Sequence, residues 1–365
     1  MRIGNKRYRT ICDDSREYPS VFAIDQNALP FSLNIIRMKT ARDVYTAIRK
    51  MSVRGAPLLG IASAYGIYLA CVEAREKRLS REKTEEFLKK QFGMLISARP
   101  TSINPEWAMR VVLDSISRYK NIDTKIEAAL RTVRRLADND AKNCRRIGMH
   151  GKKLIKDIYR KKRGERVNIL THCNAGWLAC IDYGTATAPV YLSAESKLPV
   201  HVWVEETRPR NQGAKLTAFE LKQMGIPHTI ITDNAGGYVM QKGDVDIALV
   251  GADRIALNGD ACNKVGTYKT ALAAHDNGIP FYVCAPLSII DVSKKNGFDG
   301  IVIEERDEEE VRYALSGRRR IELCSPGSGI KNYGFDITPS RLITGIITEA
   351  GIIKPDKKSI LKIKK

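Results

Sequence analysis

The sequence lacks the patterns that metal ions, nucleotides and membranes usually require. Its eight cysteines include no Cys-x-x-Cys pair and no Cys/His cluster at zinc-ligand spacing, so we predict no metal site. Neither GxxxxGK[ST] nor GxGxxG occurs, which excludes a Walker loop and the usual dinucleotide fingerprint. The opening residues are polar and we find no apolar run of membrane-spanning length, so we predict a soluble, cytoplasmic protein with reduced cysteines and no membrane partner.

Acidic residues are scarce relative to basic ones, and the formal net charge is +20. Such an excess has three explanations: nucleic-acid binding, binding of a phosphorylated small molecule, or a lysine-rich solvated surface. Much of the charge lies in residues 152–166 and 354–365, where aromatic residues do not alternate with the basic ones as they do in strand-binding surfaces. No recognition motif accompanies the charge, so we do not expect nucleic acid as a partner.

The composition is that of a globular protein, and a chain of 365 residues favours two domains, with one elaborated α/β domain as the alternative. Apolar residues at helical spacing dominate residues 1–150, which we predict to be a mostly helical N-terminal domain with a short β segment. In residues 151–365, β-branched runs alternate with helical segments that end in glycine. This pattern is typical of parallel βαβ units and predicts the α/β class, with a Rossmann-like, doubly wound parallel sheet.

Unusual polar residues follow the predicted strands of the second half. They are residues 172–174, 205–208, 233–234 and 251–254, each set directly after a β-branched run. Ligands of doubly wound sheets bind beyond the carboxyl ends of the strands. We therefore predict that these four sets of residues form one site.

Cys173 and Asp253 are the candidate catalytic residues within these sets. Cys173 would lie between a strand and a helix opening near residues 174–176, where the helix dipole lowers a thiol pKa; a packed core cysteine is the alternative. Asp253 follows DIALVGA, and desolvation there can raise a carboxyl pKa into the range of a general acid or base. Capping of the next segment, or pairing with Arg254, is the alternative for Asp253.

Three further segments suggest binding of an anionic ligand between the two domains. In NGDACNKVGTY, Asn263 and Lys264 precede a predicted helix whose first amides could donate to an anion. Residues 54–57 (RGAP) precede a long apolar helix, and proline suits its first turn, so this is either a phosphate site or a plain helix start. Arg99 and the basic cluster around Gln212 add to the candidate anion contacts.

Six motifs occur in order over nearly the whole chain, from about Ile24 to FDITPSRLITGIITEAGII. They are SVRGAPLLGIASAYG, ARPTSINPEWA, LTHCNAG, EETRPRNQGAKLTAFEL, TDNAGGYVMQKGDVDIALVGADRIALNGDACNKVGTYKTALAA and PFYVCAPLSIID. Together they resemble the methylthioribose-1-phosphate isomerase family, a branch of the superfamily that includes the alpha, beta and delta subunits of translation initiation factor 2B.

The resemblance implies an aldose–ketose isomerase that converts 5-methylthio-D-ribose 1-phosphate to 5-methylthio-D-ribulose 1-phosphate in methionine salvage, as a homodimer without a cofactor or metal. The C1 phosphate locks the sugar as a ring, so the ring must open before hydrogen moves from C2 to C1. By position, Cys173 corresponds to the catalytic cysteine and Asp253 to the aspartate that donates a proton. The implied substrate contacts are Arg54, Gly55, Ala56, Arg99, Gln212, Asn263 and Lys264.

His172 neighbours Cys173 and at first suggests a Cys-His couple. Successive strand residues point to opposite faces, so we predict a structural role for His172. We expect the partner of Cys173 to be Asp253, about two strands across the sheet.

Some residues depart from the family pattern: the leucines of RGAPLLG, Trp177, Asp182 and the Arg210-Asn211 pair. They leave the 5-substituent open, so 5-deoxyribose 1-phosphate or another 5-modified pentose 1-phosphate is an alternative substrate. Ribose 1,5-bisphosphate isomerisation is disfavoured by the salvage-type motifs RGAP and QGAKLTAFEL. A regulatory subunit like those of translation initiation factor 2B is the alternative from another functional class.

Overall fold

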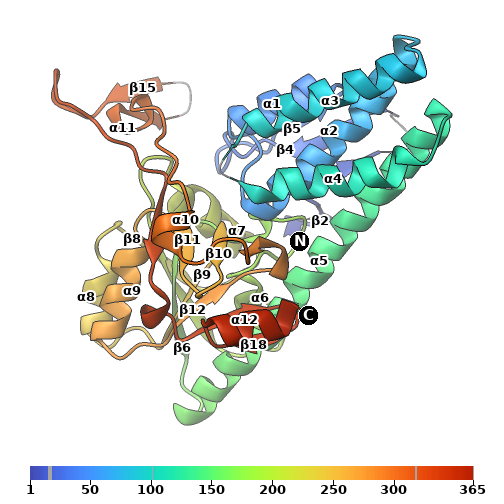
Figure 1. Ribbon diagram of the computed structural model, residues 1–365. Coiled ribbons are helices and arrows are strands. Elements are labelled where there is room, and N and C mark those ends of the chain that lie inside the picture. The colour runs from blue at the N-terminus through green and yellow to red at the C-terminus, as the bar shows by residue number, and fades with distance from the viewer. Residues whose placement is uncertain (15–18, 101, 317–318, 365) are drawn as a thin grey trace. The chain divides into compact units, whose positions relative to one another are not determined.

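The computed structural model describes the chain except residues 15–18, 101, 317–318 and 365 (Figure 1). It divides into two compact units. The first comprises Met1, Arg7–Lys142 and Leu178–Asp182, and the second comprises Arg2–Lys6, Asn143–Trp177 and Tyr183–Lys365. The chain passes from one unit to the other within α5 (Ile122–Lys161), the helix in which the predicted division between residues 150 and 151 also falls.

The first unit is mostly helical and carries a three-stranded antiparallel sheet. The strands pair in the order β3-β4-β5, and the helices pack around α2. Its elements are β3 (Ile11–Asp13), β4 (Val21–Ile24), β5 (Ile35–Met38), α1 (Ala41–Arg49), α2 (Ala56–Glu76), α3 (Arg81–Ser97), α4 (Ile103–Ser117) and the first part of α5. The short strands β1 (Arg2–Ile3) and β2 (Lys6–Arg7) form a separate ribbon.

Helix α2 is the centre of the first unit. Nearly all of its residues are buried, on every side of the helix, against α1, α3 and α4. A helix that is apolar all round needs such an enclosure. Contrary to the sequence-based expectation, α2 is long and apolar enough to cross a membrane by length and composition alone, but 89% of its most apolar window is buried inside the protein.

The second unit is built on a seven-stranded sheet in the order β18-β17-β12-β9-β6-β7-β8. Every neighbouring pair is parallel except β17 with β18. The predicted parallel, doubly wound architecture is therefore confirmed. The strands are β6 (Val167–His172), β7 (Val200–Glu205), β8 (His228–Ile231), β9 (Ile247–Val250), β12 (Phe281–Cys284), β17 (Gly345–Thr348) and β18 (Gly351–Ile353).

The strand order creates a topological switch point beside β6. The chain runs outward from β6 through β7 to β8, then returns to place β9 on the other side of β6 before continuing to β12. Connections on the two sides of β6 therefore diverge at the carboxyl ends of β6 and β9, and such a switch point is where doubly wound sheets bind ligands.

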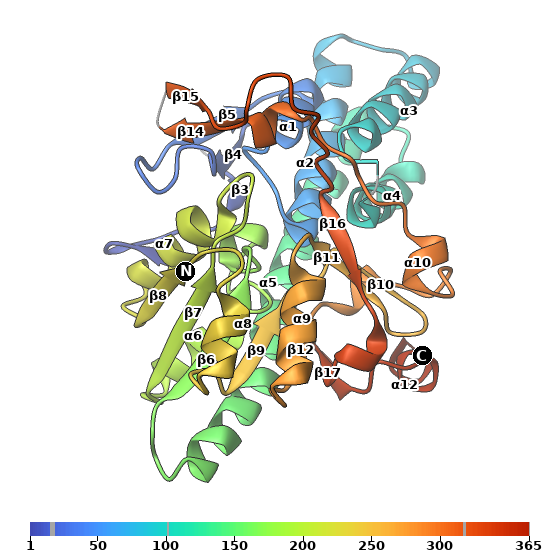
Figure 2. The same cartoon turned by 90° about the vertical axis from the view of Figure 1, so that its left-hand side faces the viewer.

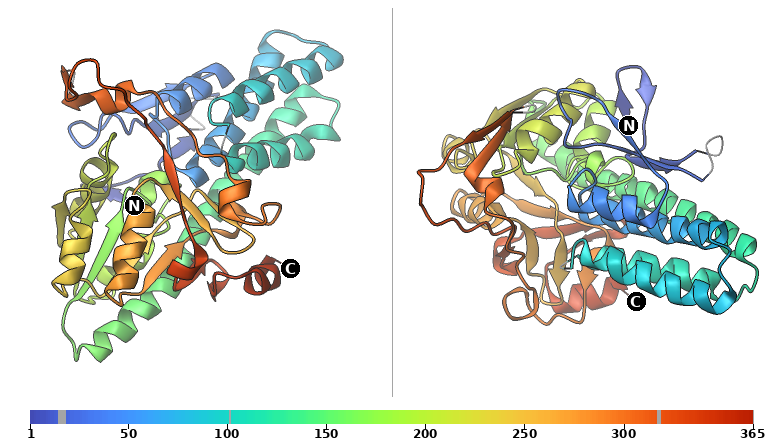
Figure 3. Two further views of the ribbon diagram at one scale, coloured as in Figure 1. Left: turned by 60° about the vertical axis from the view of Figure 1, so that its left-hand side comes forward. Right: turned by 90° about the horizontal axis from the view of Figure 1, so that it is seen from above.

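Helices cover both faces of this sheet (Figures 2 and 3). On one face, α8 (Gly236–Gln241) and α9 (Thr267–Asp276) bury apolar side chains against β9 and β12. On the other, α6 (Ala188–Glu195) lies against the end of α5. A Cβ on Gly151 of α5 would lie 2.4 Å from the Pro189 side chain, so this close helix packing requires glycine.

A smaller sheet in the order β13-β10-β11-β16 adjoins the site edge of the second unit (Figure 2). Its strands β10 (Arg254–Ala256) and β11 (Ala261–Lys264) form a hairpin, so NGDACNK turns at its Asn-Gly pair. The remaining elements include β13 (Ile290–Asp291), β14 (Tyr313–Ser316), β15 (Arg319–Glu322), β16 (Phe335–Thr338), α7 (Ala218–Gln223), α10 (Gly297–Gly300), α11 (Glu309–Arg312), α12 (Lys357–Lys364) and 3-10 turns at Trp177–Ala179, Leu287–Ile289 and Ser340–Leu342.

Candidate active site

Cys173 follows β6 directly and is held in a left-handed backbone conformation, with φ of +62°. Such a φ is uncommon for a residue other than glycine and needs support from its surroundings. Support comes from the Thr217 hydroxyl, which donates to the Cys173 carbonyl over 2.6 Å. The expected helix opening at residues 174–176 is absent, because only a three-residue 3-10 turn follows, at Trp177–Ala179. A helix dipole at Cys173 was therefore the wrong prediction.

The loop after Cys173 is held by Glu220, a residue that sequence reasoning did not single out. Its fully buried carboxylate accepts from the Asn174 side chain (3.1 Å), the Trp177 amide (3.1 Å) and the Tyr191 hydroxyl (2.6 Å). These donors satisfy the buried carboxylate and fix the backbone beyond Cys173. The motif that contains Glu220, TAFEL, could be identified in the sequence. The partners of Glu220 could not, because they are 29 to 46 residues away along the chain.

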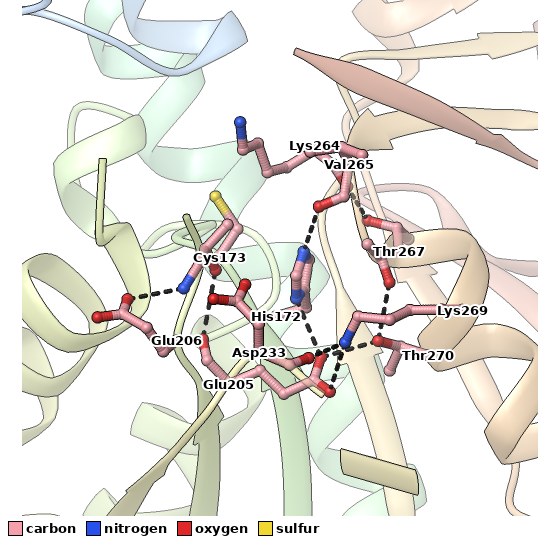
Figure 4. Close-up of polar contacts among 12 residues, drawn as sticks. His172, Cys173, Glu205, Glu206, Asp233, Lys264, Val265, Thr267, Lys269 and Thr270 are labelled. Atoms are coloured by element: carbon pink, nitrogen blue, oxygen red, sulfur yellow. Dashed lines mark hydrogen bonds and ion pairs between the residues drawn. The ribbon is translucent and has the colours of Figure 1, made fainter. Parts of the chain in front are cut away.

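Lys264, at the end of β11, is the residue that brings the predicted groups of the second unit together. Burial lowers the pKa of Lys264, while the nearby Cys173 and Asp253 oppose that shift electrostatically. In Figure 4 the Lys264 amine and the Cys173 sulfur lie on the same side of the polar network. Two of the predicted strand-end groups thus share one neighbourhood with the predicted anion-binding lysine.

Asp253 lies three residues beyond β9, the strand that pairs directly with β6. It is therefore one strand away from Cys173, closer than predicted. The Asp253 amide donates to the Cys262 carbonyl over 2.9 Å, which ties it to the β10–β11 hairpin. Burial, followed by the charge of Asp253, raises the pKa of the Cys262 thiol. Arg254, proposed as its alternative partner, forms an ion pair with Asp291 at 3.6 Å.

The helix-start amides that were expected to bind an anion already have a partner. Helix α9 begins at Thr267, and the amides of Gly266 and Tyr268 donate to the Asp336 carboxylate at 2.6 and 3.2 Å. That part of the predicted anion cradle is wrong. Asn263 remains buried beside Lys264, where its side-chain amide donates to the Thr267 hydroxyl over 3.0 Å.

Gln212 precedes a five-residue π-helical turn, Gly213–Thr217. Its Oε1 is buried and accepts no hydrogen bond from any residue that the structure describes. A buried acceptor without a partner is costly, so this oxygen suits a hydroxyl donated by a ligand. A Cβ on Gly213 would lie 2.0 Å from the Glu205 carbonyl, so the Gln-Gly pair lets the turn pass against the end of β7.

The polar pair that precedes Gln212 is accounted for by its contacts. Arg210 forms an ion pair with Glu310 at 2.8 Å, and Arg306 reaches the same carboxylate at 2.7 Å. The Asn211 side chain donates to Glu206 over 2.8 Å.

Burial raises the pKa of Glu310, but its hydrogen bonds and charge interactions with the two arginines outweigh burial and lower that pKa to about 2. Arg306 and Glu310 also act electrostatically on Lys264, so this ion-pair cluster borders the site.

His172 points into a buried network beneath Cys173 (Figure 4). Its Nδ1 lies 3.0 Å from Glu205 Oε2 and its Nε2 lies 3.0 Å from the Val265 carbonyl oxygen. The expected orientation, away from the thiol, is consistent with these contacts. The structural role of His172 stays a prediction, and its network reaches Val265, the residue after Lys264.

Four of the predicted substrate contacts belong to the first unit. Gly55 is the N-cap of α2, with φ of +98°, and a proline follows in the first turn, as expected. A Cβ on Gly55 would lie 2.6 Å from Ala179, so glycine is required there. Arg54 and Arg99 are both buried, and Arg99 contacts the Met51 sulfur at 3.2 Å, which places Arg99 close to the segment that leads into Arg54. Ala56 begins α2.

Among the residues described in the second unit, no three His, Cys, Asp or Glu side chains bring their ligand atoms together. The groups available at the site edge are a thiol, an amine, a carboxylate and an amide. They suit proton transfer and binding of an anion. The expectation that no metal takes part stays a prediction.

Comparison with known proteins identifies the family of the chain. Residues 52–355 match the model of the initiation factor 2 subunit family. A curated methylthioribose-1-phosphate isomerase from Desulfatibacillum aliphaticivorans is 47% identical over 99% of this chain and 98% of its own length. The crystal structure of 5-methylthioribose 1-phosphate isomerase from Pyrococcus horikoshii is 36% identical, with a TM-score of 0.85, over 98% of this chain and 96% of its own.

A second solved structure, described as translation initiation factor eIF-2B subunit delta from A. fulgidus, is also 36% identical, with a TM-score of 0.80, and covers 98% of this chain and 100% of its own. The α/β fold and the family resemblance are thus confirmed. The chain belongs to the initiation factor 2 subunit family and, within it, to the methylthioribose-1-phosphate isomerases.

Proposed function

We propose that this chain isomerises 5-methylthio-D-ribose 1-phosphate to 5-methylthio-D-ribulose 1-phosphate in methionine salvage. The proposal is supported by the electrostatic influence of Cys173 and Asp253 on the buried Lys264, in a chain that is 47% identical to a curated isomerase over nearly its full length. A regulatory subunit has no need of a thiol, a carboxylate and a buried lysine in this arrangement. The curated relatives likewise do not favour that alternative.

Asp253, Cys173 and Lys264, the three reactive residues of the second unit, each have a chemical role in the proposal. Asp253 protonates the ring oxygen as the bond between that oxygen and C1 breaks, which leaves C1 as an oxocarbenium ion that still carries the phosphate ester. Hydrogen then moves from C2 to C1, and the C2 hydroxyl loses its proton to become the ketone. Cys173 stabilises or exchanges charge at C1 and C2 while hydrogen moves from C2 to C1. Lys264 supplies positive charge to the phosphate and the open C1 region. No atom is gained or lost overall, since aldose and ketose are isomers.

The other substrate contacts complete the proposal. Gln212 Oε1 accepts from a sugar hydroxyl, and Asn263 holds the loop beside Lys264. Arg54 and Arg99, with permanent charge, bind the phosphate, while Gly55 and Ala56 allow the backbone to approach it closely. Their support is the family motif together with the burial of both arginines and the glycine-only conformation of Gly55.

Proton NMR of the purified protein with 5-methylthioribose 1-phosphate in deuterated water tests this function. Conversion to the ketose is expected. Incorporation of deuterium at C1 would indicate proton transfer through an enediolate, and retention of the substrate hydrogen would indicate a hydride shift. Absence of any conversion would refute the isomerase proposal.

Side-by-side turnover of 5-methylthioribose 1-phosphate, 5-deoxyribose 1-phosphate and ribose 1,5-bisphosphate tests the choice of substrate. The methylthio compound is expected to have the highest kcat/KM. A higher value for either alternative would reassign the 5-substituent.

We further propose a cytoplasmic homodimer that works without metal or organic cofactor. Dialysis against a chelator is expected to leave turnover unchanged, because thiol, carboxylate and amine groups carry the proposed chemistry. Light scattering after size-exclusion chromatography is expected to give the mass of two chains. Loss of turnover on chelation, restored by a metal, would contradict the cofactor-free proposal.

A further inference from the structure

His172 occupies a central position beneath the proposed site. It is the last residue of β6, its side chain is fully buried, and both of its ring nitrogens face oxygen atoms at 3.0 Å. One oxygen belongs to the Glu205 carboxylate at the end of β7, and the other is the carbonyl of Val265. The ring therefore spans from the central sheet to the segment that follows Lys264 (Figure 4).

The partners determine the protonation state of the ring. A carbonyl oxygen only accepts, so Nε2 must carry a proton to bond Val265. Glu205 Oε1 lies 3.4 Å from the Lys269 ammonium, and the Thr270 hydroxyl lies 2.8 Å from Oε2. These neighbours stabilise an ionised carboxylate, which also accepts, so Nδ1 must carry a proton as well. Both contacts of the ring are hydrogen bonds at the same time if both nitrogens donate, as they do in an imidazolium ion.

Other charged groups around the ring are consistent with that charge. Asp233, after β8, and Asp336, on β16, are both partly buried. Burial raises the pKa of each carboxyl, and the neighbouring His172 lowers it in turn. Glu205 is the carboxylate in hydrogen-bond contact with the ring, and Asp233, Asp336 and the Lys269 ammonium are further charged groups of the network.

Two glycines leave the network no room to shift. A Cβ on Gly266 would lie 2.8 Å from His172 Cε1, and a Cβ on Gly236 would lie 2.1 Å from Glu205 Oε1. Both are shorter than the separation that non-bonded heavy atoms tolerate. The backbone therefore packs directly on the ring and on the carboxylate and restricts both to one arrangement.

We propose that His172 is a positioning residue of the isomerase site, a charged clamp that joins the ends of β6 and β7 to the backbone after β11. Cys173 is bonded to His172 through the chain, and Lys264 to Val265, so the clamp sets the separation of the thiol and the amine. This role rests on the proposed function, because the two groups it holds are those assigned to the reaction.

The protonation state is tested without any measurement of activity. In protein labelled with 15N-histidine, both ring nitrogens of His172 are expected to show protonated imidazolium shifts at neutral pH. The signals are assigned by their loss in His172→Gln or, if that variant does not fold, by contacts between the ring protons and Thr270. A neutral ring with one bare nitrogen at neutral pH would overturn the charged clamp.

Kinetics tests the positioning role, with His201→Gln as the matched control. His201 is also buried, on β7 at the opposite end of the sheet, where it contacts the Thr229 hydroxyl at 3.0 Å. In His172→Gln we expect kcat/KM to fall roughly 100-fold, with kcat lowered and KM raised, because misplacing reacting groups by about 1 Å has effects of that size. The control is expected to keep both constants near the wild-type values.

A double variant shows whether the effect passes through Glu205. If the clamp acts as a unit, His172→Gln with Glu205→Gln is expected to be no slower than the slower single variant. Lower thermal stability of His172→Gln with unchanged kcat and KM of the folded protein would reduce His172 to a structural role. Wild-type protein without isomerase activity would refute the proposed function and leave the NMR result standing.

Discussion

The two units supply different kinds of chemistry to the proposed reaction. The first unit contributes the buried arginines Arg54 and Arg99. It also contributes the start of α2, where Gly55 is the N-cap with φ of +98°. From the second come Cys173, Asp253 and Lys264, all of which can exchange protons. In the proposed function, the first group of residues would bind the anion and the second would carry out the reaction.

The architecture of each unit explains this difference. Helix α2 is enclosed on all sides by apolar side chains, so polar groups of that helix can serve a ligand only at its ends. In the second unit the parallel strands β6, β7, β8 and β9 all end at one edge, and their following residues converge there. A buried apolar helix therefore has polar groups for a ligand only at its ends, whereas a parallel sheet brings several reactive side chains together at one edge.

Replacement of the reactive groups should have the largest effect. We expect Cys173→Ser and Asp253→Asn each to lower kcat by about 1000-fold or more while leaving the fold intact, because the thiol that exchanges charge at C1 and C2, or the general acid, is lost. Steady-state turnover and circular dichroism check this. Cys324→Ser, a half-buried cysteine of the same unit, serves as the control. Turnover near the wild-type rate in either variant would end the assignment of roles.

Replacement of an anion-binding arginine should have a smaller effect, and that effect should fall mainly on KM rather than on kcat. For Arg54→Lys we expect kcat/KM to fall about 10- to 100-fold, mainly through KM, since lysine cannot reproduce a bidentate contact with phosphate and a charge-assisted hydrogen bond contributes about 1.5–3 kcal/mol. Arg110→Lys is the control, because Arg110 is on the surface of the same unit and pairs with Glu106. A decrease in kcat with unchanged KM would contradict the assignment of Arg54 to substrate binding.

The ion-pair cluster beside Lys264 predicts a pH effect on stability. The folded-state pKa of Glu310 is about 2, below its ordinary value of 4.5. Its stabilisation is therefore fully present above the unfolded-state pKa and is lost as the pH falls from about 4.5 towards 2, by at most about 3 kcal/mol. Chemical unfolding across this range should show a shallower pH dependence for Glu310→Gln than for wild type.

Two observations sharpen that test. Glu308→Gln, which removes a more exposed carboxylate 3.4 Å from Arg312, should follow the wild-type pH dependence. Because the cluster borders Lys264, Glu310→Gln should also raise KM a few-fold. An unchanged KM would place the cluster outside the influence of the site.

The smallest functional effect is expected from the capping box of α1. The Thr40 hydroxyl accepts from the Asp43 amide, and the Asp43 carboxylate accepts from the Thr40 amide. Thr40→Ala should reduce the free energy of unfolding by about 1 kcal/mol and leave kcat and KM unchanged. Altered kinetic constants would show that the first unit contributes more than fixed anion contacts.

The sequence predicted the strand-end positions of Cys173 and Asp253 better than their surroundings. Alternation of strands and helices placed Cys173 and Asp253 at strand ends, and both lie there. The predicted helix after Cys173 failed because the distant Glu220 carboxylate packs directly on Gly176 and accepts from the Trp177 amide, which holds this segment as a loop. The helix-start amides failed as an anion site because Asp336, about 70 residues away, occupies them.

The sequence by itself determined the alternation of helices and strands and the set of reactive side chains, because hydrophobic periodicity and turn residues act over short distances along the chain. The tertiary structure decided the strand order, which puts β9 beside β6 and Asp253 one strand from Cys173. It also decided the partners of His172, which lie 33 and 93 residues away. A buried polar group must find a hydrogen-bond partner, but only the completed fold determines which one, since such contacts depend on chain segments that no local pattern relates.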